Sequence, residues 1–141
     1  MRRRWLAFAI ASALAPLARP SIAQPRVVRE QRVLPPFDRI VMRTIGELTV
    51  TQGPNEHFWV EAEPKVVARV RAIVNAGTLT IEIEGRVRTE ARVRFHATVR
   101  SLRALTTEGS GNTQIVKLRG ESLDLVVGGS GSLDARSIDI K

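Results

Sequence analysis

The chain has 141 residues, with 22 Lys and Arg against 14 Asp and Glu, and it contains no Cys. This length suggests a single domain. The lack of cysteine excludes a disulfide framework, a thiolate zinc site and a lipid-modified cysteine, so the fold must depend on its hydrophobic core. Four of the basic residues lie within residues 1–23, which leaves 18 against 14, spread along predicted strands. Surfaces that bind nucleic acids are instead clustered and interleaved with aromatic residues, so we expect no nucleic-acid partner.

Residues 1–23 have the organisation of a secretory signal peptide. Arginines at positions 2–4 precede an apolar run over residues 5–14, and the small residues Ser21 and Ala23 close the segment. Small residues at positions −3 and −1 predict cleavage after Ala23. The apolar run is shorter than the roughly 20 residues that span a bilayer, so we expect no transmembrane segment after cleavage. The prediction is an exported protein of a Gram-negative bacterium, either periplasmic or secreted to the cell surface.

The rest of the chain reads as strands. Residues 24–36 are polar and end in two prolines, which indicates a linker or a loosely held first edge. Across residues 37–141, hydropathy alternates with a period of two, which is typical of half-buried strands. The apolar positions that we predict to face the core are Ile40, Met42, Leu48, Val50, Phe58, Val60, Leu79, Ile81, Ile83, Val93, Phe95, Ala97 and Val99. After Pro64 we predict one helical turn, and then a strand that runs into a turn at residues 75–77.

The triplet Gly-Ser-Gly occurs at residues 109–111 and again at residues 129–131, a shift of 20. The same shift pairs Leu105 with Leu125. A fixed period of this length indicates stacked coils, because short strands joined by tight corners complete one turn in about 20 residues. Glycine suits such corners because it reaches positive φ without a Cβ clash. We therefore predict an all-β fold with a solenoid-like C-terminal half, preceded by antiparallel or irregular strands. The predicted structural corners are Gly109, Ser110, Gly111, Gly129, Ser130 and Gly131.

Sharper interpretations of these glycines fail on their residue patterns. A phosphate-binding loop needs a further glycine or a Lys-Ser/Thr pair and then a helix, whereas a strand-like segment follows Gly111. A calcium β-roll needs an aspartate where Leu133 stands, and Asp134 comes one residue late, on the opposite face of the strand. A leucine-rich repeat needs a leucine where Thr107 stands, and it remains a minor alternative for the fold. We expect no cofactor and no metal site.

Candidates for catalysis are few. Neither His57 nor His96 has a nucleophile motif nearby, and Ser110 and Ser130 recur with the period of the fold, which favours a structural role. Acidic residues occur along the strands, as they do on any solvated sheet face. Those that could form a glycosidase-like pair are Glu82, Glu84, Glu108, Glu121, Asp124 and Asp134. We predict no catalytic residue and a non-enzymatic protein.

Six segments from Phe37 onward follow one another in a specific order: FDRI, IGELTVTQG, FWVEAEPKVVARV, NAGTLTI, TVRSLRALTTEGSGN and LDLVVGGSGSL. This order resembles a family of exported bacterial proteins of unknown molecular function, described as putative auto-transporter adhesin, head GIN domain. The resemblance implies a right-handed, β-helix-like domain over residues 37–141, with no catalytic residue. Members commonly contain more Gly-Ser-Gly coils, which predicts a short or truncated member whose last edge is open and guarded by Asp139 and Lys141.

The function that we expect is therefore that of an exported surface or binding module, adhesin-like, whose partner is a glycan or a protein of the envelope or the extracellular space. Two alternatives remain open. One is a carbohydrate-active β-helix enzyme, and the other is a structural envelope protein that self-associates through its C-terminal edge strand.

Overall fold

A computed structural model describes residues 25–141, and the predicted signal peptide, residues 1–23, lies outside the described residues. The described part is all-β apart from one helix of four residues. In chain order the elements are β1 (Val28–Arg32), β2 (Arg39–Met42), β3 (Glu47–Gln52), β4 (His57–Ala62), α1 (Pro64–Val67), β5 (Val70–Asn75), β6 (Thr78–Ile83), β7 (Arg94–Val99), β8 (Ala104–Thr107), β9 (Asn112–Gly120), β10 (Asp124–Val127), β11 (Leu133–Ala135) and β12 (Ile138–Ile140).

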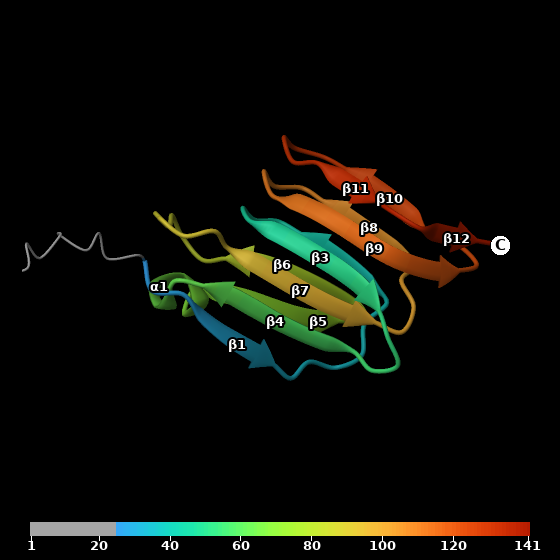
Figure 1. Ribbon diagram of the computed structural model, residues 1–141, viewed down its shortest axis with the longest axis horizontal. Helices are drawn as coiled ribbons and strands as arrows, with labels where there is room; N and C mark the ends of the chain where they lie inside the picture. Colours follow the sequence, from blue (N-terminus) through green and yellow to red (C-terminus); the bar gives the residue numbers. More distant parts are fainter. Residues whose placement is uncertain (1–24) are drawn as a thin grey trace, which may run out of the picture.

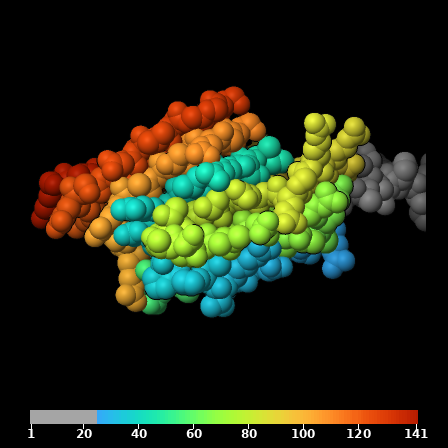
Figure 2. Space-filling model, turned by 180° about the vertical axis from the view of Figure 1, so that it is seen from behind, coloured from blue at the N-terminus to red at the C-terminus, as the bar shows by residue number. Residues whose placement is uncertain are grey.

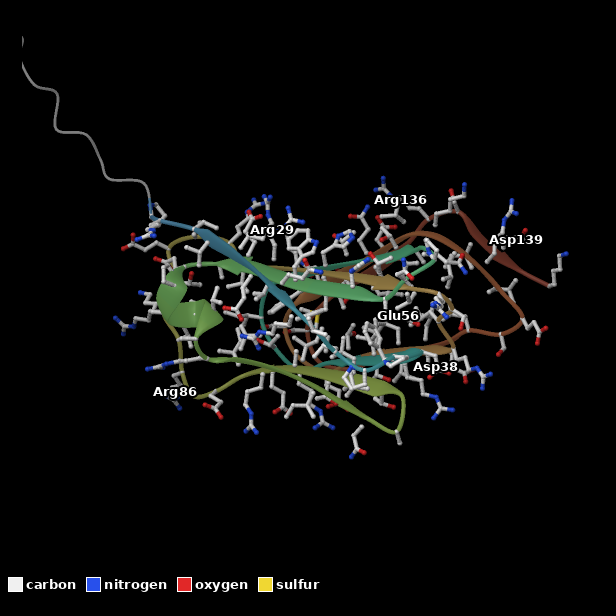
Figure 3. All side chains as sticks on the ribbon, turned by 90° about the horizontal axis from the view of Figure 1, so that it is seen from below. Arg29, Asp38, Glu56, Arg86, Arg136 and Asp139 are labelled. Carbon is white, nitrogen blue, oxygen red and sulfur yellow. The ribbon has the colours of Figure 1, made fainter. Side chains whose placement is uncertain are left out.

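The strands form two mixed sheets that lie face to face with the core between them (Figures 1 and 3). The first, sheet A, has the strand order β1-β4-β7-β3-β9-β11, and β12 also pairs with β9. The second, sheet B, has the order β10-β8-β2-β6-β5. Figure 2 shows sheet B from behind, with its strands side by side from β5 to β10. Neighbouring strands of each sheet are therefore stacked along the long axis of one two-layered body.

The strands after residue 104 pair in parallel with a constant shift. Residues 124–127 of β10 pair with residues 104–107 of β8. In the other sheet, β11 pairs with the first part of β9, Leu133 with Thr113, and β12 pairs with its last part, Ile138 with Leu118. Each pairing joins residue n to residue n + 20, which is the shift of the repeated triplets.

The strands before the triplets correct one expectation. We predicted them to be antiparallel or irregular, and β1, β4 and β5 do pair antiparallel with their neighbours. The prediction is wrong for β2, which is parallel to both β6 and β8, and for β3, which is parallel to both β7 and β9. The reason is a chain crossing. The β2–β3 pair of strands lies between β6–β7 and β8–β9, so neighbours in space are not neighbours in the sequence.

The core lies between the sheets and consists of the inward side chains of the alternating strands. The predicted core positions are confirmed as buried, except that Ile83 is half-buried. The largest members are Phe58 of β4 and Phe95 of β7, whose rings are stacked with centroids 6.2 Å apart. Burial of such aromatic side chains is a main source of stability for a fold of this kind, because it removes a large apolar area from water.

The segment between β4 and β6 folds as predicted. Pro64 begins the single turn of α1, where its missing N–H costs no helical hydrogen bond. The strand β5 then runs to Asn75 and returns as β6 through Ala76 and Gly77, whose φ values are 50° and 77°. Positive φ at both central residues matches the two-residue turn that the right-handed twist of a hairpin favours.

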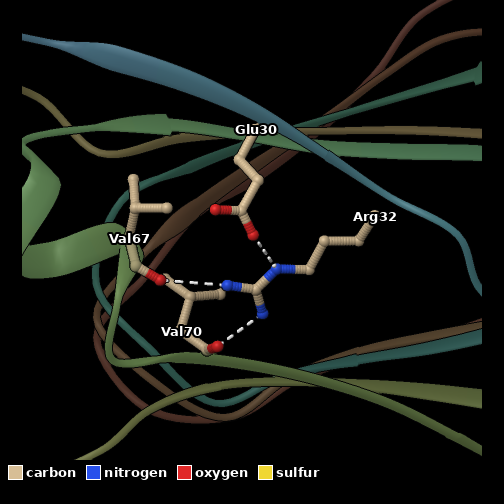
Figure 4. Close-up of polar contacts among 4 residues, drawn as sticks. All are labelled: Glu30, Arg32, Val67 and Val70. Carbon is tan, nitrogen blue, oxygen red and sulfur yellow. Dashed lines mark hydrogen bonds and ion pairs between the residues drawn. The ribbon is translucent and has the colours of Figure 1, made fainter.

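The first end of the sandwich is closed by β1 and α1. Residues 28–32 lie within the segment interpreted as a linker or first edge, and they form an edge strand that pairs with β4. Arg32 points inward from β1, donates hydrogen bonds to the carbonyl oxygens of Val67 and Val70, and pairs with Glu30 at 2.9 Å (Figure 4). The guanidinium thus ties β1 to the segment that leads from α1 into sheet B.

Glu63 holds a loop onto the same end. Its carboxylate accepts hydrogen bonds from the Thr89 hydroxyl at 2.6 Å and from the backbone N–H of Glu90 at 3.0 Å. These two hydrogen bonds, led by the one from Thr89, lower the pKa of Glu63 against the opposing effect of burial. A buried carboxylate therefore anchors the connection between β6 and β7.

Candidate ligand-binding face

The two Gly-Ser-Gly corners lie one against the other. A Cβ on Gly129 would lie 2.7 Å from the carbonyl oxygen of Gly109, and a Cβ on Gly131 would collide with the carbonyl oxygen of Gly111. Among the four glycines only Gly129 has a positive φ, of 78°. The predicted reason for glycine therefore holds at that position only. At the other three, glycine is needed because the backbone of the neighbouring corner occupies the place of a Cβ.

A third corner, residues 44–46, lies under the first triplet. A Cβ on Gly109 or Gly111 would lie within 2.8 Å of the carbonyl oxygen of Thr44. Sequence reasoning missed this corner because Thr-Ile-Gly does not resemble Gly-Ser-Gly. The signal that could have found it is a shift of 65, which pairs Ile40 with Leu105 and Glu47 with Asn112.

The residues considered for catalysis are not brought together. His57 contacts Gln31 at 3.4 Å and His96 contacts the Thr51 hydroxyl at 3.2 Å, whereas Ser110 and Ser130 lie exposed at the corners. Most of the considered acids face arginines: Glu82 and Glu108 both contact Arg43, Glu84 contacts Arg71, and Asp134 contacts Arg136. Across residues 25–141 there is no group of His, Asp and Glu side chains arranged to hold a metal ion. The same residues include no helix long and apolar enough to cross a membrane.

The outer face of sheet A carries a continuous row of polar and aromatic side chains. Strand register aligns one outward residue of each strand, from β1 through β4, β7, β3 and β9 to β11. In that order the row is Gln31, Trp59, His96, Thr49, Gln114 and Asp134. Arg29 and Arg136, labelled in Figure 3, lie on this same side of the molecule, near its two ends. The row crosses the strands in steps of about 4.8 Å, the spacing of paired strands.

An aromatic stack occupies the β1 side of this row. The rings of Trp59 and His96 are parallel within 3°, with centroids 5.0 Å apart, and the Arg29 guanidinium lies 3.8 Å over the Trp59 ring. Both faces of the indole are therefore covered. Partial burial, and secondarily the charge of Arg29, lower the pKa of His96 below its ordinary value of 6.5. The imidazole is consequently neutral at pH 7 and adds no charge to the face.

A shallow groove of about 260 Å³ occupies the other side of the row, between β3, β9 and β11. Its polar lining comes from Glu47, Thr49, Asn112, Gln114, Ser132 and Asp134. The Asn112 side-chain oxygen accepts hydrogen bonds from the backbone N–H and the hydroxyl of Ser132, at 3.2 and 2.9 Å. Within the described residues, no hydrogen bond engages the side chains of Thr49 and Gln114, which are half-buried. These two side chains can therefore bind a ligand.

The outer face of sheet B differs. Its central row, read across the register, is Ile73, Thr80, Val41, Thr106 and Val126. The row beside it is closed by ion pairs, since Arg43 contacts Glu108 at 2.6 Å and Glu82 at 3.4 Å. Sheet B thus presents an apolar and threonine stripe beside polar groups that already have partners, and sheet A presents polar groups that are free to accept a ligand.

Solved structures with a similar fold come from gut bacteria and one soil anaerobe. A putative adhesin from Bacteroides fragilis is 20% identical, with a TM-score of 0.77 over 84% of this chain and 56% of its own. A putative adhesin from Parabacteroides merdae is 15% identical, with a TM-score of 0.63 over 78% and 52%. A structure titled putative lipid binding protein, from Parabacteroides distasonis, is 16% identical, with a TM-score of 0.61 over 82% and 60%. The chain therefore spans between about half and three fifths of these proteins.

None of the curated proteins compared with the chain matches it. At these identities the solved structures show a shared fold. The match to a family model is more direct, since it covers residues 36–141, which is three quarters of the chain. The chain belongs to the family described as putative auto-transporter adhesin, head GIN domain.

Proposed function

We propose that this protein is an exported, non-enzymatic binding module of the cell envelope, adhesin-like, and that it binds its ligand through the outer face of sheet A. The observation that carries the proposal is the groove between β3, β9 and β11, where the polar side chains of Thr49 and Gln114 have no partner of their own. The membership of the adhesin family supports the same role. One similar structure is named a lipid binding protein, but the polar lining of this groove favours a polar ligand over an acyl chain.

An array of envelope and extracellular components tests the binding role. The purified protein should be retained by at least one glycan, peptidoglycan or outer-membrane component, and a Gln114→Leu variant should bind less. Retention of nothing across a broad array would contradict the proposal. A screen on polysaccharides tests the non-enzymatic part. Turnover that disappears on replacement of a single acid would favour the carbohydrate-active enzyme instead.

Export is the second part of the proposal, and it depends on residues 1–23. In a Gram-negative host, mass spectrometry of the periplasmic and surface fractions should find a mature chain that begins at Gln24. An Ala23→Arg variant, which removes the small residue at the cleavage site, should accumulate unprocessed. A full-length wild-type chain that stays in the cytoplasm would show that the export prediction is wrong.

The third part concerns the coil. We infer that β8 to β12 form turns of a right-handed parallel β-helix, supported by the n + 20 pairings and by the corners that contact one another. Thr106 and Val126 are register partners on the outer side of sheet B, so a Thr106→Cys, Val126→Cys pair should form a disulfide on oxidation. The matched pair Thr106→Cys, Leu125→Cys, on opposite faces, should not. A crystal structure would give the handedness.

A second candidate function is self-association through the edge of sheet B. The strand β10 is apolar, and Leu125, Val126 and Val127 are 38%, 55% and 52% exposed. Exposed apolar edge strands readily pair with other chains. Light scattering should then show dimers or larger species at high concentration, and a Val126→Lys variant should be monomeric. A wild-type protein that stays monomeric at high concentration would exclude this candidate.

A further inference from the structure

The groove on sheet A is balanced in charge. Asp134 contacts Arg136 at 3.0 Å, and Glu47 contacts Arg92 at 3.5 Å. Each carboxylate of the groove therefore has a guanidinium beside it, and no ionic group at the site lacks a counter-charge. An anionic or a cationic ligand would have to break one of these pairs to gain a partner, whereas a neutral ligand would not.

The free side chains of the groove both donate and accept hydrogen bonds. The Thr49 hydroxyl has one donor and two acceptor sites, and the Gln114 amide has two donor sites and an acceptor oxygen. They are register partners on adjacent strands, so they lie side by side. Asn112, whose oxygen is used by Ser132, retains its amide N–H groups as donors. A ligand rich in hydroxyl groups, each of which donates and accepts, matches this set.

The row also sets a direction. His96 is the register partner of Thr49 on the side away from Gln114. One face of its imidazole is covered by Trp59, so its other face is turned toward β3. A ligand that follows the row therefore meets a ring face and then the hydroxyl and amide of the groove, one strand after another. Steps of about 4.8 Å between strands suit an extended chain of ring-shaped units.

We propose that this groove binds a neutral polysaccharide, which lies across the strands from His96 over Thr49 and Gln114 toward Asp134. The proposal rests on the binding role proposed above and names its ligand class. Sugar hydroxyls bond to Thr49, Gln114 and the amide of Asn112, and a sugar ring packs on the free face of His96. The apolar stripe of sheet B takes no part.

Affinity electrophoresis and calorimetry of the full chain test this proposal. The probes are neutral polysaccharides (a β-glucan, a mannan and a dextran), with alginate as an anionic polysaccharide. At least one neutral polysaccharide should bind, with an affinity that changes little between low and high salt, because no net charge is neutralised. Binding of alginate alone, and its loss in high salt, would overturn the proposal.

Matched variants locate the site. Thr49→Val keeps the shape and the β-branching of threonine but removes the hydroxyl, so it should weaken binding by about fivefold, and Gln114→Leu by a similar factor. Thr49→Ser keeps the hydroxyl and should restore most of the affinity. The control is Thr80→Val, the same change at a half-buried strand position on sheet B, which should have no effect.

The outcomes separate this proposal from the one on which it rests. Undiminished neutral-glycan binding by folded Thr49→Val and Gln114→Leu proteins would overturn the groove as the site. If envelope components bind but no neutral polysaccharide does, the ligand class is wrong and the binding role survives. If nothing binds, both fail. Circular dichroism confirms that each variant is folded, and should the Gln114 variant misfold, Thr49→Val alone decides the result.

Discussion

Leu105 and Leu125 occupy the same position in successive strands of sheet B, yet Leu105 is 0% exposed and Leu125 is 38% exposed. The first has a strand on either side, and the second lies on the edge strand β10. At the opposite end of the molecule, β1, α1 and the Arg32 guanidinium cover the core. The comparison teaches that burial here depends less on the residue than on whether another layer covers it.

The largest expected effect contrasts the two leucines. Leu105→Ala should lower the free energy of unfolding by about 2–5 kcal/mol, because it leaves a cavity in a packed core. Leu125→Ala should cost about 1 kcal/mol or less, as at other partly exposed positions. Equilibrium urea unfolding measures both. Equal losses for the two variants would show that the edge position is covered in solution, and would break the comparison.

The glycine corners give the next effect. Gly111→Ala should destabilise by about 1–3 kcal/mol through overpacking, because its Cβ would lie 2.6 Å from both the Thr44 carbonyl oxygen and the Met42 methyl. Gly131→Ala should cost less, since the outermost corner can move away. Gly128→Ala, whose Cβ would lie 3.6 Å from its nearest neighbour, is the control. Thermal unfolding should rank the three variants in that order, and a harmless Gly111→Ala would refute the close contact.

A smaller effect is expected where Arg32 closes the first end. Arg32→Met keeps much of the stem but removes two hydrogen bonds to backbone carbonyls, and should cost about 1 kcal/mol. Hydrogen exchange should show faster opening of β1, with β9 unaffected. Arg39→Met, an exposed arginine without an ion pair within the described part of the chain, serves as the control. If both variants behave alike, the Arg32 contacts do not close the end.

The smallest effect concerns pH. Hydrogen bonds from Thr89 and Glu90 lower the folded-state pKa of Glu63 below its ordinary value of 4.5, so the unfolded chain takes up the proton first as the pH falls. The stabilisation is present above pH 4.5 and is lost as the pH falls through the folded value. Glu63→Gln should flatten the dependence of the urea midpoint on pH in that window. The exposed Glu121→Gln should leave it unchanged, and identical profiles for both variants would contradict the assignment.

Much of the fold could be predicted from residues that are close in the sequence. Alternation of apolar side chains identifies the core positions, because each strand is half-buried and its side-chain period is two. Pro64 marks the single helical turn, and Gly77 marks the hairpin, since both effects are local. The two triplets give the shift of 20 because β8 to β12 are laid down in sequence order.

The rest depends on contacts between distant residues. The corner at residues 44–46 pairs with a segment 65 residues away, and the β6–β7 strands are inserted between β3 and β4, so no period reveals either. The stack of Arg29, Trp59 and His96 also needs the register of three strands. For the same reason the groove could not be seen in the sequence, since Thr49, Gln114 and Asp134 are brought together only by pairing.

The constant pairing of residue n with residue n + 20 makes the last layer a template for growth. A tandem duplication of residues 121–140 would present each new strand with the same backbone groups and the same side chains that β10, β11 and β12 meet on β8 and β9. Length can therefore evolve at this end by one genetic event per layer. At the other end, where Arg32 and Glu63 make contacts that occur once, each added layer would need a new closure.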